Sequence, residues 1–175
     1  MKKLLVVVDY QKDFVDGALG FPAAPALEQP IIEKIEAYRR AGQTVAFTLD
    51  THQADYLSTQ EGKNLPVLHC VEGSVGHGLY GRLAGLLREG DEVFEKPNFG
   101  STGLFDYLRG ETFDSVELVG LVSNICVLAN AVLAKTALPE AIIEVDALCT
   151  ASFDEALHRA ALDVLEGLQV RVANR

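Results

Sequence analysis

The stretch VELVGLVSNICV, residues 116–127, indicates how this chain folds. Its first seven residues are apolar apart from Glu117, and a short apolar run of this kind is typical of a strand buried in a sheet. A longer helical pattern follows over Ile125–Leu138, and Pro139 closes it. A strand that leads directly into a helix is the repeating unit of parallel α/β sheets.

Cys126 lies in the first turn of that predicted helix. The backbone N–H groups and the positive end of a helix dipole favour the thiolate form of a cysteine there, and they can also hold an oxyanion. This position therefore favours a nucleophile, although most free cysteines are small buried hydrophobes. Cys70 and Cys149 have no comparable surroundings, and we interpret both as packing residues.

Short apolar runs alternate with longer helical patterns along the rest of the chain as well. The predicted strands are Lys3–Val8, Thr44–Leu49, Asp91–Phe94, Ser115–Val119, Ala141–Val145 and Gln169–Val172. The predicted helices are Pro30–Ala41, Leu79–Arg88, Ser101–Leu108, Ile125–Leu138 and Ser152–Glu166. The pattern predicts one domain over residues 1–175, with an α/β fold in three layers (α/β/α) and a Rossmann-like sheet of six mainly parallel strands.

Composition excludes several classes of protein. The chain has 175 residues, of which 49% are apolar, and 15 basic against 25 acidic residues give it a net charge of −10. It has no basic stripe, so we expect no nucleic-acid partner. No run approaches the roughly 18 apolar residues of a membrane span, so we expect no membrane partner. Three cysteines cannot all pair, which fits a reducing cytoplasm.

Polar or reactive residues stand at the predicted carboxyl ends of four strands. Asp9 follows the first strand, Asp50 the second, Lys96 the third and Cys126 the fourth. Ligands of open parallel sheets bind at this edge, where the strand order reverses. Each residue alone also has a purely structural interpretation: Asp9 can cap a helix or turn, and Lys96 can be a solvated surface lysine. Together they predict a catalytic group of Asp9, Lys96 and Cys126.

A second group predicts a metal site. Asp50 and His52 flank Thr51 at a strand end, and His69 follows in a long loop. A carboxylate and two imidazoles are ligands for zinc, iron(II) or manganese and leave positions open for water or substrate. Glu61, between the histidines, is a candidate fourth ligand. The alternative is that His52 caps a turn and His69 makes an ordinary loop hydrogen bond. We expect His77 and His158 at the surface.

The segments 9–29 and 51–78 are too long for ordinary connections, and long loops in compact domains are usually functional. Phe14 follows the first strand and Phe99 follows Lys96. Either aromatic ring can stack on a flat substrate, and for Phe14 a lid contact is the alternative. We predict both as substrate-binding residues, and we interpret Ser101 as a helix N-cap.

The order of these motifs resembles the isochorismatase-like cysteine hydrolases, and among them the nicotinamidase/pyrazinamidase group. The resemblance covers nearly the whole chain. Its motifs are VDYQKDF (8–14), DTH (50–52), HCVEGS (69–74), EKP (95–97) and GLVSNICV (120–127). A tryptophan that often lines the pyridine pocket of these enzymes is missing, and Leu65-Pro66 stands in its place.

The resemblance implies a triad of Asp9, Lys96 and Cys126. It also implies a cis peptide between Val122 and Ser123, and an oxyanion hole formed by the N–H groups of Val122 and Cys126. In the nicotinamidase branch, the residues matching Asp50, His52 and His69 hold one divalent metal ion. Members are often homo-oligomers, and no nucleotide cofactor is expected.

The resemblance further implies hydrolysis of a linear amide C–N bond in a small-molecule amide, most simply nicotinamide to nicotinate and ammonia, through a thioester on Cys126. The open metal position would receive the pyridine nitrogen. Two alternatives within the superfamily are a carbamoyl or ureido amidohydrolase and an isochorismatase. A flavodoxin-like binding module is a third, but the segment after the first strand, DYQKD, is acidic and has no glycine to cradle a phosphate.

Overall fold

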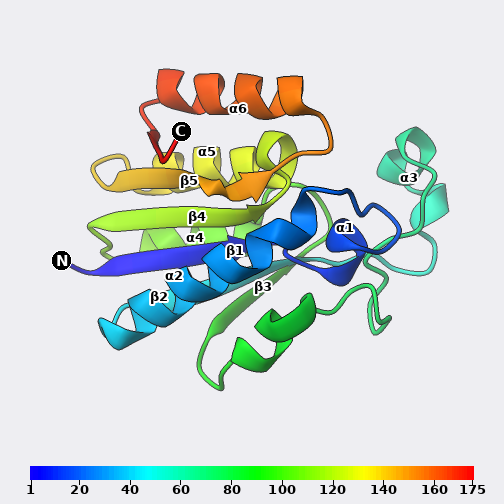
Figure 1. The fold of residues 1–175 in the computed structure, drawn as a ribbon, viewed down its shortest axis with the longest axis horizontal. Coiled ribbons are helices and arrows are strands. Elements are labelled where there is room, and N and C mark those ends of the chain that lie inside the picture. Colours follow the sequence, from blue (N-terminus) through cyan, green and yellow to red (C-terminus); the bar gives the residue numbers. More distant parts are fainter.

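The computed structural model describes all residues, 1–175. Six parallel strands form one sheet in the order β3-β2-β1-β4-β5-β6 (Figure 1). The strands are β1 (Lys3–Val8), β2 (Thr44–Asp50), β3 (Glu92–Lys96), β4 (Ser115–Leu121), β5 (Ile142–Ala151) and β6 (Arg171–Ala173). The predicted α/β class is confirmed, and the sheet is parallel throughout. Its order reverses between β1 and β4, so a ligand crevice is expected there.

Helices cover both faces of the sheet. They are α1 (Lys12–Val15), α2 (Glu28–Arg40), α3 (Gln60–Asn64), α4 (Thr102–Gly110), α5 (Leu128–Ala137) and α6 (Glu155–Gly167). In Figure 1, α2 crosses in front of the sheet, α4 and α5 lie behind it, and α1 and α3 lie beyond the carboxyl ends of the strands. The segments predicted to be functional, 9–29 and 51–78, contribute α1 and α3 at that edge. No helix is both long and apolar enough to cross a membrane.

Alternate residues of β1 pack into different cores. Leu4 and Val6 join a cluster with α4, α5 and α6, whereas Leu5 and Val7 join a second cluster with α2. Both clusters consist mainly of buried aliphatic side chains, with a few aromatic rings and cysteines, and the central strands are therefore apolar on both faces and lack the alternation of a half-exposed sheet. These two cores fix the position of the central strands and therefore of the residues at their ends.

Two predicted elements differ most from the structure. A helix was expected over Leu79–Arg88, but this stretch contains only a 3₁₀ helix, Gly81–Leu86. Gly81 has φ +54°, and no side chain caps the first turn, so an α-helix does not start there. Strand β5 extends to Ala151 rather than Val145, through an irregular register opposite Leu118 and Gly120.

Gly120 allows β4 to approach β1 closely. Its φ is +112°, and an added Cβ would lie 2.0 Å from the carbonyl oxygen of Val8. A residue with a side chain can adopt neither this conformation nor this spacing without strain. Gly120 lies two residues before Val122, so the approach determines where β4 leaves the sheet.

Candidate active site

The three residues predicted as a triad lie together at the switch point of the sheet. The Lys96 Nζ atom is 2.7 Å from Asp9 Oδ2 and 3.6 Å from Cys126 Sγ. Asp9 is 0% exposed, Lys96 1% and Cys126 5%. Asp9 follows β1, Lys96 ends β3, and Cys126 lies in the first turn after β4. Thus the plain reading of Lys96 as a surface lysine is wrong.

Hydrogen bonds fix the orientation of the buried ammonium and carboxylate. Thr48 Oγ1 donates to Asp9 Oδ1 at 2.6 Å, and Lys96 Nζ donates to the Asn98 carbonyl at 2.9 Å. The Lys96 ammonium also lies 3.3 Å from Asp50 Oδ1, because Asp50 and Lys96 are register partners in β2 and β3. A buried charge is costly unless it is paired, and here the lysine is paired with two carboxylates.

Burial raises the pKa of both acids of the triad. It raises the pKa of Asp9, and Lys96 opposes this only in part. Burial also raises the pKa of the Cys126 thiol well above its ordinary value, and the Asp9 carboxylate raises it further, while Lys96 lowers it. Burial and the Asp9 charge therefore oppose the thiolate that the start of the helix was expected to favour. The sulfur keeps its proton until a base removes it.

The turn that carries Cys126 differs from the expected one. The cis peptide joins Leu121 and Val122, at the end of β4, and not Val122 and Ser123. The Val122 carbonyl then accepts the N–H groups of Ile125 and Val127, so the helix opens with a π turn, Ser123–Val127, before α5. Strand β4 ends at Leu121, two residues later than the predicted end at Val119, and the cis bond follows it directly.

Asp50, His52 and His69 form a buried cluster, as the sequence predicted. One potential ligand atom from each residue lies within 4.8 Å of the other two. The distances from Asp50 Oδ2 are 3.0 Å to His52 Nε2 and 3.4 Å to His69 Nε2. Burial would raise the pKa of Asp50, but the two imidazoles and Lys96 lower it below its ordinary range.

The donor set of this cluster fits a metal ion. His69 Nδ1 lies 2.7 Å from the Val67 carbonyl, a contact that places the ring proton on Nδ1 and leaves the Nε2 lone pair facing Asp50. The Nε2 atom of His52 is buried and has no hydrogen-bond partner. Two imidazole nitrogens and a carboxylate oxygen that converge on one point are consistent with a metal site. The Tyr56 ring packs 4.4 Å from the His52 ring and 5.0 Å from the His69 ring, between centroids, and holds both in place.

Two side chains missed in the sequence analysis hold the cluster. Gln11 Nε2 donates to the Asp50 carbonyl at 2.9 Å, and Asp50 N–H donates to Gln11 Oε1 at 2.7 Å. Asp13 Oδ2 accepts the N–H of Cys70 at 2.8 Å, next to His69. Both stand in VDYQKDF, and the available signal was a glutamine three residues after the first strand, beside the predicted site.

Glu61 lies at the edge of the cluster. Its Oε1 atom is 3.8 Å from His52 Nε2, farther than the carboxylate of Asp50. Burial and the charge of Asp50 raise the pKa of Glu61, and the two histidines oppose this. Glu61 belongs to α3, so a short helix in the long loop, and not the sheet, determines its position.

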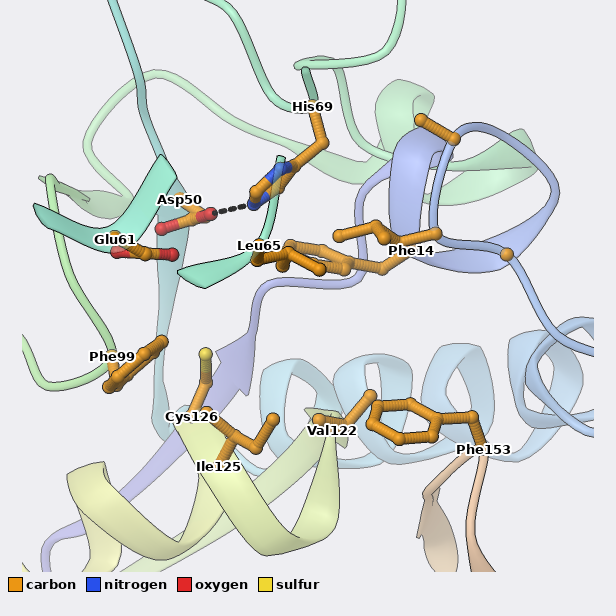
Figure 2. Close-up of a pocket in the computed structure, with 13 residues that line it drawn as sticks. Phe14, Asp50, Glu61, Leu65, His69, Phe99, Val122, Ile125, Cys126 and Phe153 are labelled. Carbon is orange, nitrogen blue, oxygen red and sulfur yellow. Dashed lines mark ion pairs between the residues drawn. The ribbon is translucent and has the colours of Figure 1, made fainter. Parts of the chain in front are cut away.

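A mostly apolar cavity of about 550 Å³ connects the thiol and the cluster. Figure 2 shows Cys126 pointing into this cavity, with Asp50, His69 and Glu61 on one side and Val122 and Ile125 beside the sulfur. Phe14 and Phe99 both line it, as does Leu65, which stands in the place of the missing tryptophan. Phe153 also lines it and was not singled out from the sequence. Its charged lining residues are Asp50 and Glu61, apart from any charge on His69, and no lysine or arginine lines it.

The remaining histidines and cysteines have structural contacts. His77 and His158 were expected at the surface, but both are half-buried. His77 Nε2 lies 2.8 Å from Thr51 Oγ1, and His158 Nδ1 lies 2.9 Å from Ser123 Oγ in the nucleophile turn. Cys70 and Cys149 are buried, in agreement with their interpretation as packing residues.

This is a doubly wound α/β protein with a carboxylate, an ammonium and a thiol buried at its switch point, as in a hydrolase that uses cysteine. The isochorismatase domain model matches residues 3–174, and the chain belongs to the isochorismatase family of hydrolases.

Relatives agree with this assignment. An uncharacterized isochorismatase family protein, PncA of Bacillus subtilis, is 31% identical over 144 residues, which are 75% of this chain and 78% of the relative. The crystal structure of a nicotinamidase/pyrazinamidase PncA from Bacillus subtilis is similar, with a TM-score of 0.89, 30% identity and coverage of 99% of this chain and 100% of that one. The N-carbamoylsarcosine amidase of Thermoplasma acidophilum has a TM-score of 0.82 and 27% identity, with coverage of 99% and 96%.

Proposed function

We propose that this protein hydrolyses a small, uncharged aromatic carboxamide, nicotinamide in the first instance, to the carboxylic acid and ammonia. The observation that carries the proposal is one apolar cavity bordered by both the Cys126 thiol and the Asp50 and His69 side chains. The similarity to the Bacillus subtilis nicotinamidase/pyrazinamidase supports it. The nucleophile, the base and the group that orients the ring would all act within this cavity.

In the proposed mechanism, Asp9 is the base. Its carboxylate takes the proton of the Cys126 thiol while Lys96 holds that carboxylate in place. The sulfur then attacks the amide carbon, and the N–H groups of Val122 and Cys126 hold the oxyanion. Asp9 returns the proton to the departing ammonia. The same carboxylate then activates a water that cleaves the thioester and releases the acid and the thiol.

The raised pKa values agree with this sequence of steps. Because burial raises the pKa of Cys126, the thiol keeps its proton in the free protein. Because the pKa of Asp9 is raised too, its carboxylate is a stronger base than an exposed aspartate. A base and an acid whose pKa values are both raised can exchange one proton over a short path during attack.

Asp50, His52 and His69 would hold one divalent metal ion, with Glu61 at its edge. A bound ion would supply an open coordination position for the ring nitrogen and so orient the carboxamide toward Cys126. Phe14 and Phe99 would contact the two faces or the edge of the ring. Zinc, iron(II) and manganese all suit this mixture of carboxylate and imidazole.

The charges of the cavity favour a neutral substrate over the two alternatives within the family. N-carbamoyl amino acids and isochorismate carry carboxylates, and a site for them requires a cationic side chain that faces the ligand. Here the lining offers the Asp50 and Glu61 carboxylates, and the Lys96 ammonium is buried between Asp9 and Asp50. A bound divalent ion would offset the Asp50 charge, so the preference rests on the missing partner: a substrate carboxylate would find no lysine or arginine in the cavity, whereas a neutral ring needs none.

The test is ammonia release from nicotinamide, pyrazinamide and N-carbamoylsarcosine, each with and without a chelator, followed by metal readdition. We expect release from the two aromatic amides, its loss with the chelator, and recovery with zinc, iron(II) or manganese. Cys126→Ala is the control for background hydrolysis. Turnover of N-carbamoylsarcosine in preference to nicotinamide would refute the proposed substrate class.

A further inference from the structure

Asn130 is a buried amide that the proposed mechanism does not use. It lies on α5, four residues after Cys126, and it is 0% exposed. Asparagine is a poor residue for a helix interior, and a buried amide is costly unless its polar atoms are bonded. Its presence at this position therefore requires a compensating set of contacts.

All the contacts of the Asn130 amide go to the site. Its Nδ2 group donates to the carbonyl of Cys126 at 2.8 Å and to the carbonyl of Phe99 at 3.1 Å, and its Oδ1 atom accepts the N–H of Ser101 at 2.9 Å. The two carbonyls can only accept and the N–H can only donate, so these partners determine the orientation of the amide.

These bonds join two parts of the active site that are far apart in the sequence. One is the turn that carries Cys126, and the other is the loop 97–101 that follows Lys96 and carries Phe99. The Lys96 ammonium fixes the start of this loop through the Asn98 carbonyl, and Asn130 fixes the rest of it. The loop also packs against α5, because a Cβ at Gly100 would lie 2.8 Å from Leu133 Cδ1.

We propose that Asn130 is a positioning residue, whose side-chain amide sets the spacing between the Cys126 sulfur, the Lys96 ammonium and the Phe99 wall of the cavity. This inference rests on the proposed function, in which Cys126 is the nucleophile. Asn130 touches neither the thiol nor the substrate cavity, so it acts through the backbone of Cys126 and of the loop.

The experiment compares Asn130→Asp with Ser101→Ala. Aspartate has the same shape and can still accept the Ser101 N–H, but it places an oxygen opposite two carbonyl oxygens. Ser101→Ala removes the cap that the Ser101 hydroxyl provides for the Leu104 N–H and leaves the Asn130 bonds intact. It is therefore the control for a general loss of stability in the same loop.

For Asn130→Asp we expect kcat for nicotinamide to fall about 10- to 100-fold with KM changed less than about threefold, because misplacement of reacting groups by about 1 Å costs on this order. The rate of Cys126 alkylation by iodoacetamide should also fall several-fold, since the sulfur loses its spacing to Lys96. Ser101→Ala should lower the melting temperature and leave both rates near wild type. Asn130→Ala, which introduces no charge, should reproduce the kinetic pattern.

Wild-type kcat and alkylation rate in a folded Asn130 variant would overturn the inference, and so would equal losses in Ser101→Ala. If neither Asn130 variant folds while Ser101→Ala does, the amide serves the fold and not the spacing, which also overturns it. The alkylation rate requires no substrate. A wild-type protein that releases no ammonia from any carboxamide would therefore refute the proposed function while the alkylation rates still decide the role of Asn130.

Discussion

The two halves of the active site are built differently. Asp9, Lys96 and Cys126 lie at the ends of three parallel strands, and the backbone ladder fixes their positions. His52 and His69 lie in the loop after β2. This loop is held by the bond from Gln11 to the His77 carbonyl, the bond that Asp13 accepts from the Cys70 N–H, and one isolated bridge between His52 and Val71. The sheet half is therefore expected to be rigid and the loop half separable from it.

The largest effect is expected from a substitution that disables only the sheet half of the site. Cys126→Ala should lower ammonia release by roughly 10⁴-fold or more, because removal of a nucleophile leaves only binding and the oxyanion hole. Metal content should stay at the wild-type level, since the Cys126 sulfur is not one of the ligand atoms of the cluster. Activity would be measured by ammonia release and metal by elemental analysis. Retained activity would remove the thiol from the mechanism.

The second largest effect is expected from a substitution that disables only the loop half of the site. His52→Ala should reduce the metal content of the purified protein to a small fraction and lower activity roughly 10²-fold, because it removes one of three ligands. The alkylation rate of Cys126 should change little, since the sheet holds the thiol. His158→Ala is the control for metal content alone, because it removes a half-buried histidine outside the cluster but one that contacts Ser123 in the nucleophile turn. Parallel loss of thiol reactivity in His52→Ala would show that the halves are not separable.

Asp13→Asn tests the support of the loop. One asparagine oxygen replaces two carboxylate oxygens that accept the N–H groups of Cys70 and Ala18, so one bond is lost. We expect metal affinity to fall about 10-fold to 100-fold, as for other outer-shell partners of a metal site. Asp16→Asn makes the same change in charge at an exposed position of the same turn and should leave affinity unchanged. Equal effects in both variants would assign the loss to charge alone.

The smallest expected effect is on the pH dependence of Cys126 alkylation, which tests the sheet half of the site. Because burial and the Asp9 carboxylate raise the pKa of Cys126, the thiolate fraction at neutral pH is lower than that of a free cysteine. Alkylation by iodoacetamide at pH 8 should be slower than for a free thiol, and its rate should still rise as the pH increases past the ordinary thiol pKa of about 8.5. Cys126→Ala corrects for Cys70 and Cys149. A rate plateau below pH 7 would contradict the raised pKa.

The difference between the sheet half and the loop half also explains how much of the site could be predicted from the sequence. Apolar runs identify buried strands, and the carboxyl ends of parallel strands share an edge, so Asp9, Asp50, Lys96 and Cys126 could be placed together without coordinates. The cluster residues could be named, but not the bonds that hold them, because Gln11 and Asp13 bond to backbone groups far away in the sequence, those of Asp50 and Cys70. The position of the cis bond and the net direction of the Cys126 pKa depend on packing, which periodicity does not report.

Gly120 limits how this chemistry could be transferred to another scaffold. At this position the chain has a backbone conformation that only an achiral residue adopts easily, and it passes so close to Val8 that even one methyl group would collide. A designer who grafts the cysteine turn onto another parallel sheet would have to transplant the glycine and the neighbouring strand with it. A library that randomises residue 120 should return glycine almost alone.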